Sequence, residues 1–535
     1  ARTGSVRELP SGSLLRAVTH GGQPRQVHYG RLPGTFQTQS GYHDPAGHRR
    51  KRIRPPDAGG TVPLQEGVRP RGKRTRKAIQ GKGAPSGLSS RGEDGGTPRD
   101  FQEDRRRPVS KGGSPNRDKN YPNDQYLWER ILKDFKDAES YLPEVQIDKG
   151  RVNKNAATAM VARTLMFMAY EQDERHQVIN VNKERLNEAL IYLNKLTEQE
   201  GKALDLCSNF GENFMIESDN NTKESIWEIQ YSINDNSSTG GKINRSEGLN
   251  HPWNWGGFQC CGFHHASYTM GNAFKTGENG LPLFDTYNDD CYGDYIKKAD
   301  GSDDITLVDA GNKAFFDRYT FDPRFSHTIC APGQPWKYDP YLIFEARGIR
   351  NGVEYGYLKS VKELPHPNCD CLLYDGWQFN SMNKRLIRYD EVILWKAEVL
   401  IQLDRQDEAL PLINKIRQRA ANSLENLKTA DGSYILNYKC ELYKPGVNCT
   451  WTKEFAWKAM EWENRLELAC EGRRFFDLQR WGTLEKTMNA YFAVERNRFD
   501  WMNIARFTAG RDEFFPISQA QMKWAKGNYT QNPGY

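Results

Sequence analysis

Glu461–Trp481, with the sequence EWENRLELACEGRRFFDLQRW, is the stretch of this 535-residue chain that decides its fold. Four of its residues recur at spacings of four, three and four, so they share one face of a helix. These are Trp462, Leu466, Ala469 and Arg473. Glu463, Glu467 and Glu471 recur every fourth residue on a neighbouring face. Like charges at this spacing destabilise an isolated helix by roughly a few tenths of a kcal/mol per pair, so we expect cations close to them.

The three stacked carboxylates have two interpretations. They can belong to a structural ion-pair network, or they can act as acid and base in catalysis. The segment itself supplies four candidate cations: Arg465, Arg473, Arg474 and Arg480. We therefore favour the ion-pair network. Gly472 suits the C′ position, where a left-handed residue ends one helix before the next begins.

Charge is divided unevenly between two parts of the chain. Residues 1–120 carry 25 Lys+Arg against 10 Asp+Glu, whereas the remaining residues carry 50 against 59. Residues 1–118 contain no tryptophan and no sustained apolar period, so they cannot bury enough apolar surface to fold. We interpret them as the product of an out-of-frame start; a disordered linker or a nucleic-acid-binding tail are the alternatives. No apolar stretch follows a charged region at the start, so we expect no signal peptide in it.

Residues 119–535 have the composition of a folded domain, and their apolar spacing predicts mainly helices. Expected helices cover Asp124–Leu142, a segment capped by Asn153 or Asn155, Lys183–Leu196, Ser267–Lys275, Asn383–Leu403 and Asp407–Ala421. Ser225–Ser232 alternates as a strand does. We predict a mainly α fold, a tetratricopeptide-like helical superhelix formed by 119–232 and 381–535. A large loop-rich insertion with little β structure, 233–380, interrupts it.

Aromatic residues in the insertion are candidates for binding a glycan. They lie in loops rich in Asn, Asp, Gln and Gly, as in NHPWNWGGF at 250–258 and QPWKYDPY at 334–341. A flat ring covers the apolar face of a pyranose, while amides and carboxylates bind its hydroxyl groups. The candidate ligand-binding residues are Trp253, Trp255, Trp336, Tyr338 and Trp377. The alternative is that these rings fix the loops onto the helices.

Other chemistries have weaker support. Cys260, Cys261, His251, His264 and His265 lie close in sequence, but adjacent pairs lack the spacing of zinc ligands. Asp285, Asp289 and Asp290 do not form the twelve-residue pattern of a calcium loop. The chain contains no G-x-S-x-G, H-E-x-x-H or P-loop motif. We therefore expect no catalytic residues, no metal and no cofactor.

A series of short motifs then places the chain near a known family. The residues that carry them are Trp128–Pro143, Gly150–Ala157, Glu224–Ile229, Phe274–Leu281, Asp322–Arg324, Arg388–Ala397, Asp407–Ala420, Glu461–Trp481, Phe515–Ile517 and Gln531–Tyr535. On these motifs, residues 120–535 resemble the SusD/RagB family of glycan-binding lipoproteins of the outer membrane.

The resemblance implies a tetratricopeptide-containing scaffold with a loop-rich insertion and no catalysis. It implies attachment to the outer face of the outer membrane by a lipidated N-terminal cysteine. It also implies a SusC-like TonB-dependent transporter as partner, to which bound oligosaccharides are delivered. The family's first helices and lipidated cysteine have no counterpart in residues 1–118. A tetratricopeptide scaffold that binds a protein or peptide is the alternative function.

Overall fold

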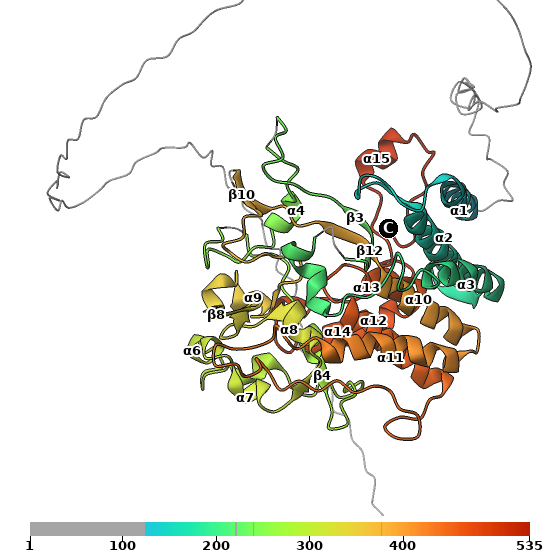
Figure 1. Ribbon diagram of the computed structural model, residues 1–535. Coiled ribbons are helices and arrows are strands. Elements are labelled where there is room, and N and C mark those ends of the chain that lie inside the picture. Colours follow the sequence, from blue (N-terminus) through green and yellow to red (C-terminus); the bar gives the residue numbers. More distant parts are fainter. Residues whose placement is uncertain (1–122, 220–221, 239, 260, 376) are drawn as a thin grey trace, which may run out of the picture. The chain divides into compact units, whose positions relative to one another are not determined.

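The computed structural model describes residues 123–535 apart from 220–221, 239, 260 and 376 (Figure 1). The predictions for residues 1–118 and for Cys260 therefore lie outside the described residues. In the described part of the chain, no helix combines the length and the apolar character needed to cross a bilayer.

Three helices pack together at the start of the described chain (Figure 1): α1 (Asn123–Tyr141), α2 (Lys154–Ala169) and α3 (Lys183–Thr197). The N-terminus of α2 confirms one of the two predicted caps, because the Asn153 side chain accepts the N–H of Ala156 at 3.0 Å. Asn182 caps α3 in the same way. Small buried alanines along α2 allow α1 and α3 to approach it closely.

A second group of helices packs against the first: α10 (Tyr389–Gln402), α11 (Gln406–Asn422) and α12 (Lys453–Glu467). α10 is apolar and buried on nearly all sides, because it contacts α3 on one side and α11 and α12 on the other (Figure 1). A helix that is apolar all round belongs in a core. Three more helices follow: α13 (Arg474–Arg480), α14 (Leu484–Glu495) and α15 (Gln519–Trp524).

One predicted helix boundary is wrong. The expected helix Asn383–Leu403 begins only at Tyr389, and β12 (Lys384–Arg388) before it pairs antiparallel with β3 (Ser225–Ile229). Arg385 and Ile387 are buried while Lys384 and Leu386 are only half-buried. This two-residue period is that of a strand. The predicted strand at 225–232 is confirmed over its first five residues.

Short elements and loops fill most of 233–380. Their strands form two-stranded antiparallel ladders, as does β1–β2 near the start. The paired strands are β1 (Tyr170–Gln172) with β2 (Val178–Val181), β4 (Lys275–Thr276) with β5 (Thr320–Phe321), β6 (Ile329–Cys330) with β9 (Lys359–Ser360), β7 (Pro335–Trp336) with β8 (Asp339–Ile343), and β10 (Leu372–Asp375) with β11 (Trp377–Asn380). The short helices are α4 (Arg245–Gly248), α5 (Tyr268–Ala273), α6 (Ile305–Asp309), α7 (Lys313–Phe316), α8 (Arg324–Thr328) and α9 (Gly352–Tyr355). Helices this short show no clear 3.6-residue period, so of these only α5, within the expected Ser267–Lys275 helix, was predicted.

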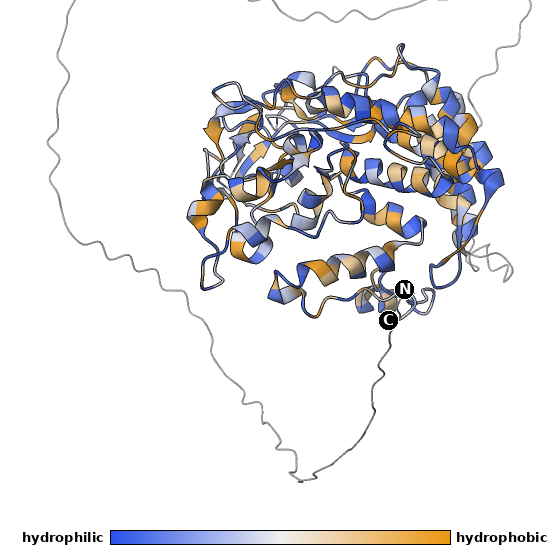
Figure 2. Cartoon of the chain, turned by 90° about the horizontal axis from the view of Figure 1, so that it is seen from below, coloured by the Kyte–Doolittle hydropathy of each residue, from blue (hydrophilic) through white to orange (hydrophobic). Residues whose placement is uncertain are grey.

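Two apolar cores meet at α12. The core of the long helices includes its residues Ala456, Ala459 and Met460. The core of the loop region includes Trp462 and Leu466, the predicted apolar face of the helix. Figure 2 shows hydrophobic and hydrophilic residues alternating along the helical ribbons, as in amphipathic helices. The opening stretch of sequence thus connects the helices to the loops.

The carboxylates of this stretch lie in a buried ion-pair network, as predicted. Arg324 donates to Glu467 at 3.0 Å and to Glu463 at 2.7 Å, and all three side chains are fully buried. Across the described chain, the network joins six carboxylates to five cations. The carboxylates are Glu224, Asp322, Asp390, Glu463, Glu467 and Glu471; the cations are Arg324, Lys362, Arg388, Arg417 and Arg419. Burial raises the pKa of Asp390 well above its usual value.

The expected source of the cations is wrong. Arg473, Arg474 and Arg480 of the same segment pair with other acids, and Arg465 lies over the rings of Tyr287 and Trp462. Side chains of one helix project outward together, so the buried acids are reached by arginines of packed neighbours such as α8 and α11. The helix also ends at Glu467, before Gly472, although Gly472 does have a positive φ of 78°.

Candidate functional site

The hairpin of β7 and β8 has an unusual turn. Trp336 pairs with Asp339, so Lys337 and Tyr338 alone form the connection. Their φ angles are 35° and 72°. Two-residue turns of this kind normally use Asn-Gly or Gly-Gly, because other residues are disfavoured there by about 1–2 kcal/mol each. Strain of this kind persists only where the surroundings hold it, and it concentrates at functional sites.

Two sets of hydrogen bonds hold this turn. Lys337 Nζ donates to the carbonyl oxygens of Val361 at 3.0 Å and Lys362 at 2.8 Å. Burial lowers the pKa of Lys337 to about 7. The Tyr338 hydroxyl lies 2.8 Å from His327 Nδ1. The turn is therefore anchored through both of its side chains.

His327 fixes the direction of the Tyr338 hydroxyl. Its Nε2 lies 2.8 Å from the carbonyl oxygen of Ser423, which can only accept. Nδ1 is then the acceptor, and Tyr338 donates to it. Burial lowers the pKa of His327 to about 4, so the ring is neutral. A Cβ at Gly211 would lie 2.6 Å from the Tyr338 hydroxyl oxygen, so glycine is required where this backbone passes.

Tyr338 lies in the wall of a pocket of about 530 Å³. The pocket residues come from two short 3-10 helices (Phe210–Phe214 and Ile216–Ser218), from the β7–β8 hairpin and from the loop 365–371. They are Phe214, Met215, Ile216, Glu217, Lys337, Tyr338, Asp339, Pro365, His366, Asn368, Cys369, Asp370, Cys371 and Met382. The volume is in the range of small-molecule sites.

Polar groups line the pocket beside the Tyr338 ring. His366 Nε2 donates to Asp339 Oδ2 at 2.9 Å, and both side chains are about one-third exposed, at 31% and 30%. Asn368 and Asp370 are exposed on the adjoining loop. A disulfide between Cys369 and Cys371 constrains that loop. An aromatic ring with carboxylates and an amide around it can hold a sugar by its face and its hydroxyl groups.

The structure places two predicted ligand residues in the core. Trp255 and Trp336 are 3% and 0% exposed, and their ring centroids lie 5.3 Å apart. Phe344 packs against both rings. Trp336 Nε1 donates to the carbonyl oxygen of Pro365 at 3.2 Å. In this structure the two rings present no face to solvent and instead support the hairpin and the pocket wall.

Trp253 lies on the surface. It is 38% exposed, and the Arg350 guanidinium lies 5.0 Å from its ring centroid. The loop that carries Trp253 packs against Pro367 at Gly256, next to the pocket residues 366 and 368. Trp377 lies in β11, and its side chain is outside the described residues. Of the four predicted residues whose side chains the structure describes, only Tyr338 thus lines the pocket.

Comparison with known proteins gives the family. A model of the SusD family matches residues 223–535, which is more than half of the chain. The chain belongs to the SusD family. Its quoted motifs from Glu224 to Tyr535 lie inside the matched region.

SusD-like protein P38 of Formosa agariphila is 33% identical over 122 residues, which are 23% of this chain and 22% of that protein. The match thus spans about a fifth of that relative. Similar solved structures include a SusD homolog from Bacteroides thetaiotaomicron, 17% identical, covering 77% of this chain and 70% of that one with a TM-score of 0.48. Another is a laminarin-binding SusD-like protein, 18% identical, covering 77% and 69% with a TM-score of 0.44.

The described residues of this SusD-family chain do not support the zinc and calcium sites that were considered as alternatives. Among the described residues, the one group of three or more His, Cys, Asp or Glu side chains close enough to share an ion is Glu224, Asp390 and Glu467. Arg388 and Arg419 pair with these buried carboxylates, which leaves no free charge for a cation. Lys458 neutralises Asp285. Burial lowers the pKa of both His251 and His265 to about 4, and neither ring belongs to such a group in the part of the chain that the structure describes.

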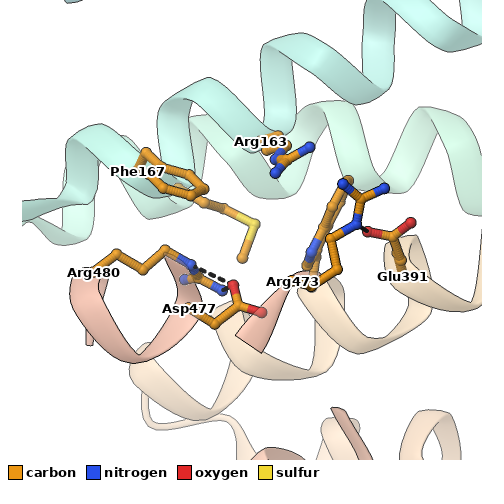
Figure 3. A pocket seen from close by; sticks show the side chains of 8 residues that line it. Arg163, Phe167, Glu391, Arg473, Asp477 and Arg480 are labelled. Atoms are coloured by element: carbon orange, nitrogen blue, oxygen red, sulfur yellow. Dashed lines mark hydrogen bonds and ion pairs between the residues drawn. The ribbon is translucent and has the colours of Figure 1, made fainter. Parts of the chain in front are cut away.

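Two other hollows of the SusD-family fold suit a sugar less well. A wider one of about 720 Å³ is lined by Tyr357 as its one aromatic residue, and that ring is buried. A cavity of about 10 Å³ among α2, α10 and α13 has room for about one water. Figure 3 shows Arg163, Arg473 and Arg480 around this cavity. In the described chain, Arg163 has no hydrogen bond or ion pair and lies over the Phe167 ring at 5.8 Å.

Proposed function

We propose that this chain is a non-catalytic binding protein for an oligosaccharide or polysaccharide at the cell surface, and that it delivers the glycan to a TonB-dependent outer-membrane transporter. The observation that carries the proposal is the strained hairpin turn that holds Tyr338 in the pocket wall. Membership of the SusD family supports the same function. The transporter partner and a lipid anchor on the outer membrane follow from the family resemblance.

The proposal includes an architecture. The long helices before residue 232 and after residue 381 form a tetratricopeptide-like superhelical scaffold, and 233–380 is the insertion that contributes ligand-binding loops. α2–α3 and α10–α11 are consecutive helices that pack on each other, as hairpins of such a scaffold do. The pocket lies where the insertion meets the segment after α3.

Replacing Tyr338 by alanine tests the binding site. We expect the full chain to be retarded in native gels by at least one polysaccharide of a panel. Tyr338→Ala should weaken that binding by tenfold or more, which is about 1.4 kcal/mol. Tyr341→Ala is the matched control, because Tyr341 is 80% exposed on β8 of the same hairpin and does not line the pocket.

Four results would decide against parts of the proposal. Equal losses in Tyr338→Ala and Tyr341→Ala would place the binding site elsewhere. Loss of binding in Trp253→Ala alone would assign the site to the exposed Trp253 loop. If no polysaccharide retards the chain and a peptide binds to it, the alternative of a protein-binding scaffold would be supported. Release of reducing ends from a bound glycan would contradict the non-catalytic role.

A further inference from the structure

The charges around the pocket are predominantly negative. Among the described residues, three carboxylates line it, from three separate segments of the chain: Glu217, Asp339 and Asp370. Glu217 and Asp370 are exposed, and Asp339 is 30% exposed. Burial alone would raise the pKa of Asp339, but hydrogen bonds from the Tyr341 N–H and His366 lower it below its usual value. Asp339 is therefore ionised at neutral pH.

The cationic side chains of the pocket are occupied elsewhere. Lys337 is the one Lys or Arg among the described residues that line the pocket, and its amino group donates to two backbone carbonyl oxygens. His366 donates to Asp339. The neighbouring Lys384 and Arg385 do not line the pocket and pair with Glu363 and Asp219. Binding a carboxylate or sulfate normally needs an available Arg or Lys, and none remains among the described lining residues.

We infer that the pocket is selective for uncharged glycans and rejects polysaccharides that carry uronate or sulfate groups. Like charges brought together in a pocket of reduced polarity repel each other, and such repulsion is an effective means of excluding a wrong ligand. The carboxylates remain available as acceptors for sugar hydroxyl groups. This inference rests on the proposed function and specifies its ligand class.

The test compares each neutral polysaccharide that binds with its own carboxymethylated derivative. The two share backbone and linkage, so their difference in affinity reports on charge. At low ionic strength, we expect the full chain to bind the neutral form at least tenfold more tightly. The ratio should shrink at high salt, because exposed charges are screened over about 10 Å at 0.1 M.

Asp370→Asn identifies the source of the selectivity. This variant should reduce the ratio of the two affinities severalfold, because it removes one negative charge that repels the carboxymethylated form, whereas the loss of an acceptor for sugar hydroxyl groups weakens both forms alike. Asp317→Asn is the matched control, because Asp317 is also exposed but does not line the pocket. Equal or tighter binding of the carboxymethylated form overturns the inference and leaves glycan binding intact. Binding of neither form by any member of the panel overturns the proposed function and this inference with it.

Discussion

Replacing Tyr338 by phenylalanine separates the two roles assigned to this residue. The variant keeps the ring in the pocket wall and removes only the hydroxyl that donates to His327 at 2.8 Å. His327 is 1% exposed, so Nδ1 would be left buried without a donor. An unsatisfied buried group of this kind costs about 1–3 kcal/mol.

The expected change in melting temperature follows from this free energy. Unfolding entropy is about 2.1 cal/mol/K per residue near 60 °C. For roughly 400 folded residues this is about 0.8 kcal/mol/K, so Tyr338→Phe should lower the melting temperature by about 1–4 °C. Glycan affinity should change less than threefold, because the ring face is retained.

Differential scanning calorimetry and affinity gels measure the two effects on the same protein sample. Tyr341→Phe is the control, because that hydroxyl is on an exposed side chain. A melting temperature equal to that of the parent would show that the bond to His327 does not stabilise the turn. Loss of binding as complete as in Tyr338→Ala would refute the ring-face contact and assign recognition to the hydroxyl.

Three further predictions concern stability. Glu467→Gln removes a buried charge bonded to Arg324 and Arg419 and should lower the free energy of unfolding by about 3–5 kcal/mol. Calorimetry measures this loss against the exposed Glu485→Gln control, and an unchanged melting temperature contradicts the prediction. Arg163→Met should leave the free energy of unfolding unchanged or raise it by up to about 1 kcal/mol. Burial and nearby arginines lower the pKa of Arg163, which means that they disfavour its charge. A loss of more than about 2 kcal/mol in urea titrations would argue against this prediction. Burial lowers the pKa of His327 to about 4 in the folded protein. The unfolded chain, with a histidine pKa of about 6.5, binds more protons between these values. The free energy of unfolding should therefore fall as the pH drops from about 6.5 to about 4. The fall should be smaller in His327→Gln, and a pH profile identical to that of the parent would contradict the lowered pKa of His327.

The long helices were predictable from the sequence because their apolar residues follow a 3.6-residue period over four or more turns. The cap at Asn153, one of two candidates, was also predictable because capping depends only on residues that are close in sequence. β12 was missed because Lys384–Arg388 runs directly into the helix at Tyr389, and its strand conformation depends on pairing with distant β3. The cations around Glu463 and Glu467 were misassigned because they lie more than 40 residues away in sequence.

The site was only partly predictable. The aromatic loops led to the prediction of Tyr338, which lines the pocket, but the same signal also selected the buried Trp255 and Trp336. Composition does not distinguish a ring that plugs a core from one that faces a pocket. His327 and His366 were missed because each is a single histidine whose partner lies in another segment. The positive φ angles of Lys337 and Tyr338 were not predictable, because two non-glycine residues give no sequence signal for a two-residue turn.

The buried ion-pair network has a consequence for how the binding loops can change during evolution. Arg324 of the insertion is bonded to Glu463 and Glu467 of α12, at a point where no solvent reaches either partner. Buried ion pairs therefore attach the insertion to the helices, and these bonds do not involve the surface segments that border the pocket. Under the proposed function, substitutions in loop 365–371 or around Trp253 would alter ligand preference without loosening this attachment, so new specificities could arise on an unchanged framework.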